Sequence, residues 1–143
     1  MNDRELKIER IDQDIEVVFL TADNFPHDVP DAYQVLNTLI PYNPSRRYFG
    51  ISQPDRTGAI QYKAAAEILP MENISNPKLM KFTITKGIFV SLYIINHFID
   101  SKSISNAFEQ LLQHPKLDPN GYCLEVYKDY SDVDVQCMVR TIN

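Results

Sequence analysis

Glycine and tryptophan are scarce in this sequence, which has four glycines and no tryptophan among its 143 residues. No segment has the glycine spacing of a phosphate-binding loop, and neither a GxSxG nucleophile motif nor an HExxH zinc motif occurs. These absences disfavour nucleotide-dependent chemistry, and we expect the protein to use no cofactor.

Patterns of metal ligands are missing as well. The two cysteines, Cys123 and Cys137, have neither the spacing of a zinc site nor the number needed for a secreted disulfide framework. The three histidines are scattered over different segments, and none has a second ligand at metal spacing. We therefore expect no metal or haem site, and the two thiols are expected to pack as small buried hydrophobes.

Long hydrophobic runs are also absent. The longest, residues 88–95, is interrupted by Ser91 and is far too short to span a bilayer. The charged residues at positions 3–5 are the reverse of a signal peptide. The sequence thus predicts a cytoplasmic protein that does not associate with a membrane.

Positive charge is in deficit. The chain has 14 Lys and Arg against 19 Asp and Glu, which gives a net charge of −5 and a sequence pI of about 5.1. An acidic protein repels phosphate backbones, so direct nucleic-acid binding is disfavoured. The shares of apolar residues, 44%, and charged residues, 23%, are typical of a globular protein, and the length fits one domain over residues 1–143.

The first half of the chain alternates β-rich and helical patterns. Residues 15–22 are β-rich, and an apolar stripe at helical spacing follows over residues 30–40. Residues 46–53 and 59–68 have the pattern of two further strands, joined by the turn-forming residues 54–58. The predicted order is strand, helix, strand, strand.

The second half repeats this order. Residues 81–95 form a long β-rich stretch, for which we predict a kink or bulge at Gly87. A helical stripe over residues 103–114 follows, and then two strands over residues 122–127 and 133–142. Because the order recurs, we expect an α+β fold built from a duplicated β-α-β-β repeat, with an antiparallel sheet and two helices packed on it. The two repeats span about residues 13–69 and 81–143.

Short motifs in both halves resemble the GyrI-like small-molecule-binding domain, also called the AraC-type effector-binding domain, of the SOUL/BmrR-like barrel superfamily. The motifs are KGIFV at residues 86–90, the helix over residues 103–114, NGY at 120–122, LEVY at 124–127, DVQCMV at 134–139, and in the first half YFGISQ with Gly50 and AIQYKAAAEI with Tyr62. The chain departs from the family at Leu124, where an aromatic residue or proline is frequent, and at residues 96–98, where many members have a glycine.

The resemblance implies a ligand-binding domain related to those of bacterial transcription regulators, acting here without a DNA-binding domain of its own. In drug-binding members, the acid that matches Glu125 contacts the ligand. Some stand-alone members look hydrolytic, which would make Glu125 and Tyr127 catalytic, and others bind and inhibit a topoisomerase.

Strand alternation supports Glu125 as the centre of a site. Cys123, Glu125 and Tyr127 share one face of their strand, and a turn centred near Tyr130 would place Glu125 opposite Val135. A carboxyl group among such apolar neighbours is expected to have a raised pKa. The alternative is that Glu125 occupies the solvent face of an edge strand.

Further candidates are aromatic residues on the predicted strands, because tyrosine offers a ligand both an apolar wall and a polar handle. The ligand-binding candidates, besides Glu125 and Tyr127, are Tyr48, Tyr62, Phe89, Tyr93 and Glu67. Each of these has a structural alternative, which is core packing for the aromatic residues and helix packing around Glu67.

Three functions are consistent with these observations. The first is binding of an amphipathic small organic molecule, with an organic cation as one option, and we favour it over the others. The second is a small hydrolase or isomerase that uses Glu125 and Tyr127. The third is a module that binds or inhibits another protein through its acidic surface. A homodimer formed through exposed edge strands is also consistent with the predicted sheet.

Overall fold

The computed structural model describes residues 5–128 and 133–142. Within these residues the chain forms eight strands and two helices. In chain order they are β1 (Lys7–Ile11), β2 (Ile15–Ala22), α1 (Val29–Leu39), β3 (Tyr48–Pro54), β4 (Ile60–Glu67), β5 (Met80–Ile84), β6 (Gly87–Ile94), α2 (Ser103–Leu111), β7 (Cys123–Tyr127) and β8 (Val135–Arg140). None of the described helices is long and apolar enough to cross a membrane.

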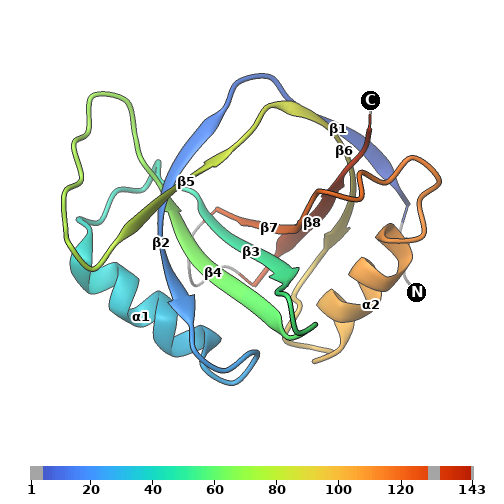
Figure 1. Ribbon diagram of the computed structural model, residues 1–143, viewed down its shortest axis with the longest axis horizontal. Helices are drawn as coiled ribbons and strands as arrows, with labels where there is room; N and C mark the ends of the chain where they lie inside the picture. The colour runs from blue at the N-terminus through green and yellow to red at the C-terminus, as the bar shows by residue number, and fades with distance from the viewer. Residues whose placement is uncertain (1–4, 129–132, 143) are drawn as a thin grey trace.

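All eight strands belong to one antiparallel sheet, which curls strongly so that its two ends approach each other (Figure 1). The strand order is β1-β6-β8-β7-β3-β4-β2-β5, which puts β7 and β3 side by side in the middle. Both helices lie outside the curl: α1 packs on β2 and β4, and α2 packs on β6 and β8. The α+β class, with an antiparallel sheet and two helices packed on it, is confirmed.

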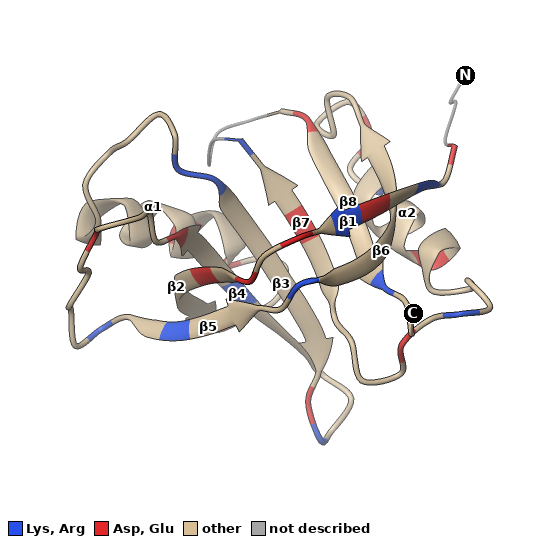
Figure 2. Ribbon diagram, turned by 90° about the horizontal axis from the view of Figure 1, so that it is seen from above, with Lys and Arg blue, Asp and Glu red and all other residues tan. Residues whose placement is uncertain are grey.

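The sheet separates two hydrophobic cores, because successive side chains of a strand point to opposite faces. The outer face is the one that the helices cover, and its core includes residues of both helices, such as Leu36 and Leu111. The inner face lines the inside of the curl, with Phe49, Phe89 and Leu124 fully buried there. Charged residues are few on the central strands and frequent on β1 and the loops (Figure 2).

The segment over residues 81–95 is two strands, so the prediction of a single kinked strand was wrong. β5 pairs with β2, whereas β6 pairs with β1 and β8 at the far end of the sheet. Between them, the guanidinium of Arg140 donates hydrogen bonds to the carbonyls of Thr85 and Lys86. A side chain at Gly87 would place its Cβ 3.0 Å from Cζ of Arg140. The glycine thus marks the close approach of an arginine where the chain changes strand partners.

Two other boundaries differ from the pattern of the sequence. β1 was not predicted; it is an edge strand that pairs only with β6 and leaves Ile8 exposed, so its sequence shows little apolar alternation. The second helix ends at Leu111 and not at His114, because the chain continues in a tighter turn, with the amides of Gln113 and His114 donating to carbonyls three residues earlier.

Candidate functional site

The centre of the candidate site is Glu125, the single charged residue of β7. It lies on the outer face, opposite Gly50 of β3 and Cys137 of β8. Only 7% of its surface is exposed. A carboxyl group in the middle of a sheet is therefore covered almost completely, and its polar atoms need partners within the protein.

Two tyrosines supply partners for the carboxyl group, and a third extends the series of hydrogen bonds. Tyr127 donates its hydroxyl proton to Oε1 of Glu125 over 2.6 Å, and the hydroxyl of Tyr62 lies 3.0 Å from the same oxygen. The hydroxyl of Tyr33 lies 2.9 Å from that of Tyr62 and 2.7 Å from the carbonyl oxygen of Phe49. We call Glu125, Tyr127, Tyr62 and Tyr33 the tyrosine–glutamate cluster. It joins β7, β4 and α1 on the outer face.

Gly50 makes room for this cluster. A Cβ at this position would lie 2.6 Å from Cζ of Tyr62 and 2.8 Å from Oε1 of Glu125, and closer still to the hydroxyl of Tyr62. Real Cβ atoms do not approach other atoms to such distances. Glycine is needed here for the space above its Cα, not for an unusual backbone conformation.

Burial dominates the electrostatics of the cluster. It raises the pKa of Glu125, and the hydrogen bonds from Tyr127 and Tyr62 offset only part of that rise. Burial and the neighbouring carboxyl group also raise the pKa values of Tyr33, Tyr62 and Tyr127, so all three keep their hydroxyl protons. No cation is among the groups that shift the pKa of Glu125 within the described chain.

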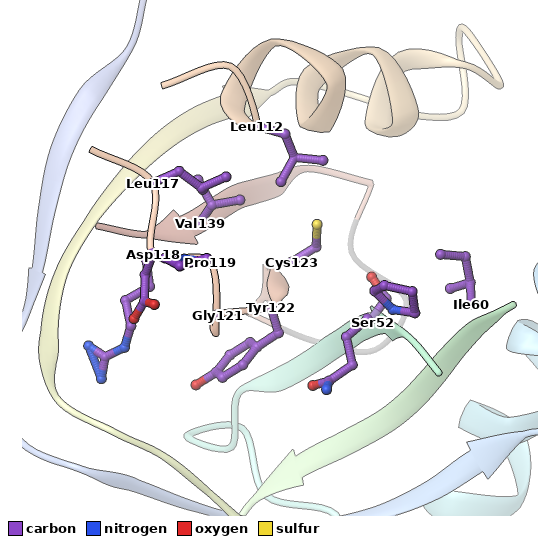
Figure 3. Close-up of a pocket in the computed structure, with 13 residues that line it drawn as sticks. Ser52, Ile60, Leu112, Leu117, Asp118, Pro119, Gly121, Tyr122, Cys123 and Val139 are labelled. Atoms are coloured by element: carbon purple, nitrogen blue, oxygen red, sulfur yellow. The ribbon is translucent and has the colours of Figure 1, made fainter. Parts of the chain in front are cut away.

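A pocket of about 370 Å³ opens on the outer face, between the sheet and the end of α2 (Figure 3). Its wall is mostly apolar and includes Pro54, Ile60, Leu112, Leu117, Pro119 and Val139. The polar and charged residues of the wall are Ser52, Gln53, Asp118, Tyr122, Cys123 and Arg140. We call this the outer-face pocket. Figure 3 shows the thiol of Cys123 pointing toward Leu112 across it.

The pocket and the cluster are adjacent on the same two strands. Ser52 and Cys123 are paired across β3 and β7, and the next outer-face pair along the strands is Gly50 and Glu125. A hydrogen bond joins the side chains of Ser52 and Cys123. Burial, with a smaller effect of Glu125, raises the pKa of Cys123 to about 11, so it stays a neutral thiol.

Aromatic residues from the loops before the two helices cover the cluster. The ring of Phe25, before α1, stacks on Tyr62 with 5.6 Å between centroids. The ring of His97, before α2, lies edge-on to Tyr127 at 5.9 Å. Phe25 and Phe98, which contacts His97, are 43% and 69% exposed. The cover over the buried carboxyl group is thus built from loops and not from the sheet.

The pairing of β7 with β8 differs by two residues from the predicted register. Glu125 lies opposite Cys137 and not Val135, and Cys123 lies opposite Val139 and not Cys137. The predicted turn centre, Tyr130, lies outside the described residues. A shift of two keeps every side chain on its face, so the predicted grouping of Cys123, Glu125 and Tyr127 agrees with the structure.

The other candidate residues are divided between the two faces. Tyr62 joins Glu125 and Tyr127, whereas Tyr48 lies nearby on the outer face with its hydroxyl donating to Oδ1 of Asn37. The structure does not bring the remaining three to this site. Phe89 is in the inner core, Tyr93 shares its face of β6, and Glu67 forms an ion pair with Arg47 at the end of β4.

Two residues of the site were not singled out from the sequence. Tyr33 was assigned only to the apolar stripe of α1, and Gly50 only to a motif. A tyrosine within a stripe of aliphatic residues is a usable signal, because its buried hydroxyl needs a polar partner. In the described residues, no group of three or more His, Cys, Asp or Glu side chains is placed to hold a metal ion.

Comparison with known proteins shows a similar fold. No protein-family model matches the sequence, and no curated protein matches it. A solved structure, an integron cassette protein from the mobile metagenome of Vibrio cholerae, aligns with a TM-score of 0.65 over 95% of both chains. The two sequences are 14% identical, so this likeness concerns the fold alone.

Proposed function

We propose that this protein binds a small, amphipathic organic molecule in the outer-face pocket, with Glu125, which lies beyond the Ser52–Cys123 pair at the wall of the pocket, as the polar anchor. The observation that carries the proposal is the juxtaposition of a buried carboxyl group and an apolar pocket on one face of the same two strands. Ligand sites in proteins are mostly apolar concavities with a few placed polar groups.

The pocket has the size and lining of such a site. Its volume of about 370 Å³ lies within the common range for small-molecule sites, roughly 300–1,000 Å³. Aliphatic side chains at the rim, such as Ile60 and Leu112, are 43% and 48% exposed and would be covered by a ligand. Burial of such surface favours binding.

The chemistry around Glu125 favours a cationic ligand. In the described chain both hydrogen bonds to Glu125 end on Oε1, which leaves Oε2 as the acceptor for a ligand. The carboxyl group is framed by electron-rich rings, and rings of this kind attract organic cations. Asp118 and Arg140 both line the wall of the pocket, and the guanidinium of Arg140 already donates hydrogen bonds to the carbonyls of Thr85 and Lys86.

We propose further that the chain is a relative of the GyrI-like effector-binding domain that senses or sequesters its ligand in the cytoplasm. The strand order supports a duplicated β-α-β-β unit, because β6-β8-β7 in one half corresponds to β2-β4-β3 in the other. A hydrolytic role for Glu125 and Tyr127 is less favoured, since the proton of Tyr127 is already donated to Glu125.

The test is binding of two probes that differ by one atom: benzyltrimethylammonium and its neutral isostere, neopentylbenzene. Thermal shift and titration calorimetry should show binding of the cation, because bound ligand stabilises the folded state. Glu125→Gln should weaken binding of the cation at least tenfold more than binding of the neutral probe. If neither probe binds, or if the substitution affects both equally, the proposal fails.

A second variant locates the site. Leu112→Trp, at the rim, should fill the pocket and abolish binding of either probe. Met71→Trp places the same side chain on a fully exposed position away from the pocket and should leave binding unchanged. Equal binding by both variants would show that the probes bind elsewhere.

A further inference from the structure

The tyrosine–glutamate cluster contains four oxygen–oxygen contacts in series. They join Tyr127 to Glu125 at 2.6 Å, Glu125 to Tyr62 at 3.0 Å, Tyr62 to Tyr33 at 2.9 Å, and Tyr33 to the carbonyl of Phe49 at 2.7 Å. At such distances each contact is a hydrogen bond, with one proton between its two oxygens. The cluster therefore needs four protons.

An ionised Glu125 leaves the cluster one proton short. The three hydroxyl groups bring three protons, the carbonyl of Phe49 can only accept, and a carboxylate has none to donate. If Tyr62 donates to Glu125 and Tyr33 donates to Phe49, the two hydroxyl oxygens of Tyr62 and Tyr33 face each other without a proton between them. Such an unsatisfied contact is costly in a buried cluster.

A protonated Glu125 completes the series. Its own O–H donates to Tyr62, Tyr62 donates to Tyr33, and Tyr33 donates to the carbonyl of Phe49. Tyr127 donates to the same carboxyl group from the other side. Each hydroxyl group then donates one hydrogen bond, and no contact lacks a proton.

The surroundings of Glu125 agree with this proton count. The titratable groups that face it are Tyr62 of β4, Tyr33 of α1, and Tyr127 and Cys123 of β7, with Cys137 opposite on β8. His97 contacts the far side of Tyr127. Lys and Arg are not among the groups that shift the pKa of Glu125 in the described chain, so no cation there favours a carboxylate.

We infer that Glu125 carries a proton in the unliganded protein and that the site takes up an organic cation in exchange for that proton. The inference rests on the proposed function for the identity of the ligand, but not for the state of the unliganded site. On binding, the O–H bond of Glu125 breaks, its proton passes to the buffer, and the ligand's positive charge compensates the carboxylate. Tyr62 then turns its hydroxyl proton from Tyr33 to Glu125. No bond between heavy atoms changes.

The exchange has a measurable pH dependence. Each cation bound should release one proton, as long as the pH is below the pKa of Glu125 in the unliganded protein. In that range the affinity for benzyltrimethylammonium should rise about tenfold for each unit of pH. The affinity for neopentylbenzene, which carries no charge, should stay constant.

The first experiment needs no ligand. NMR of protein labelled with ¹³C at the glutamate side-chain carboxyl should show one resonance that titrates far above the others, and Glu125→Gln should remove it. Tyr33→Phe, which removes the contact with Tyr62 and leaves Tyr62 to donate to the carboxylate, should lower the pH at which that resonance titrates. A resonance of Glu125 that titrates with those of the exposed glutamates would overturn the inference.

The second experiment counts the protons. Calorimetric titration with benzyltrimethylammonium in phosphate and in Tris, which differ in ionisation enthalpy, should give one proton released per cation in the wild type. Cation binding without proton release below the NMR-determined pKa would refute the exchange. Failure of the cation to bind would refute the proposed function and the exchange together, while the NMR titration would still decide the protonation of the unliganded site.

Discussion

Gly50→Ala is expected to destabilise the protein strongly, because the added methyl group enters the tyrosine–glutamate cluster. Its Cβ would lie 2.6 Å from Cζ of Tyr62 and 2.8 Å from Oε1 of Glu125. Tyr62 has little room to retreat, since Phe25 stacks on its ring and Tyr33 contacts its hydroxyl. The cost is the sum of overpacking and of lost hydrogen bonds.

Each contribution can be bounded. Overpacking a tight core costs about 1–3 kcal/mol, and a buried polar group left without its partner costs about 1–3 kcal/mol. Together they lower the free energy of unfolding by roughly 2–6 kcal/mol. For a chain of this length that corresponds to a fall in Tm of at least about 5 °C. Urea unfolding followed by circular dichroism measures the change directly.

Gly121→Ala is the matched control. The nearest atom to a Cβ at position 121 is the carbonyl oxygen of Asp118, at 3.3 Å. We expect this variant to stay within about 1 kcal/mol of the wild type. Tyr62→Phe removes the hydroxyl that lies closest to the new methyl group at position 50, so the cost of Gly50→Ala should be smaller by about 1 kcal/mol or more in that background. An equal cost in both backgrounds, or a Gly50→Ala variant as stable as the control, would refute the steric reasoning.

Three further predictions concern pH, an ion pair and the pocket. Folding raises the pKa of Glu125, so its contribution to stability is complete at low pH and is lost as the pH rises above about 4.3. The free energy of unfolding of the wild type, relative to that of Glu125→Gln, should therefore fall with rising pH. Urea unfolding from about pH 4 to pH 8 tests this, and a constant difference would contradict it. Arg46→Ala should lower the free energy of unfolding by about 3–5 kcal/mol, because it removes a fully buried guanidinium and leaves the carboxylate of Glu72 without its partner. Arg47→Ala breaks the half-exposed ion pair with Glu67 and should lower it by about 1 kcal/mol or less in the same assay. Leu112→Trp should leave the unfolding midpoint within a few degrees of the wild type, a result that Met71→Trp should match, so that any loss of probe binding reflects a filled pocket and not a damaged fold.

Local patterns in the sequence predicted the elements well where a strand or helix has one buried face. Residues 15–22 are β2 as predicted, and the stripes over residues 30–40 and 103–114 mark the two helices. The pattern of apolar residues predicted strands least well where buried and exposed positions do not alternate along the strand. β1 is an exposed edge, and residues 81–95 are β-rich on both sides of the break at Thr85 and Lys86, whose carbonyls accept hydrogen bonds from Arg140, a residue distant in the sequence.

The grouping of Cys123, Glu125 and Tyr127 on one face was also a local property. A strand has a period of two, so the grouping survives even though the register with β8 differs by two residues from the predicted one. The resemblance to GyrI-like domains pointed to the same acid, and that relationship stays a prediction.

The composition of the site around Glu125, in contrast, depended on which strands became neighbours. Tyr62 reaches Glu125 across 63 residues of sequence, and Tyr33 reaches Tyr62 across 29. Phe89 and Tyr93 lie on the opposite face of the sheet, although both are aromatic residues on strands, like Tyr62 and Tyr127.

The sequence alone therefore determined that this chain forms an α+β fold and that Glu125 shares one face of its strand with Cys123 and Tyr127, because both follow from the periodicity of side chains along one element. Only the tertiary structure decided that two tyrosine hydroxyl groups contact this carboxyl group beside a pocket, and that no cation within residues 5–128 and 133–142 shifts its pKa. That outcome depends on the order of strands in a curled sheet, and strand order is set by packing between segments that no local pattern connects.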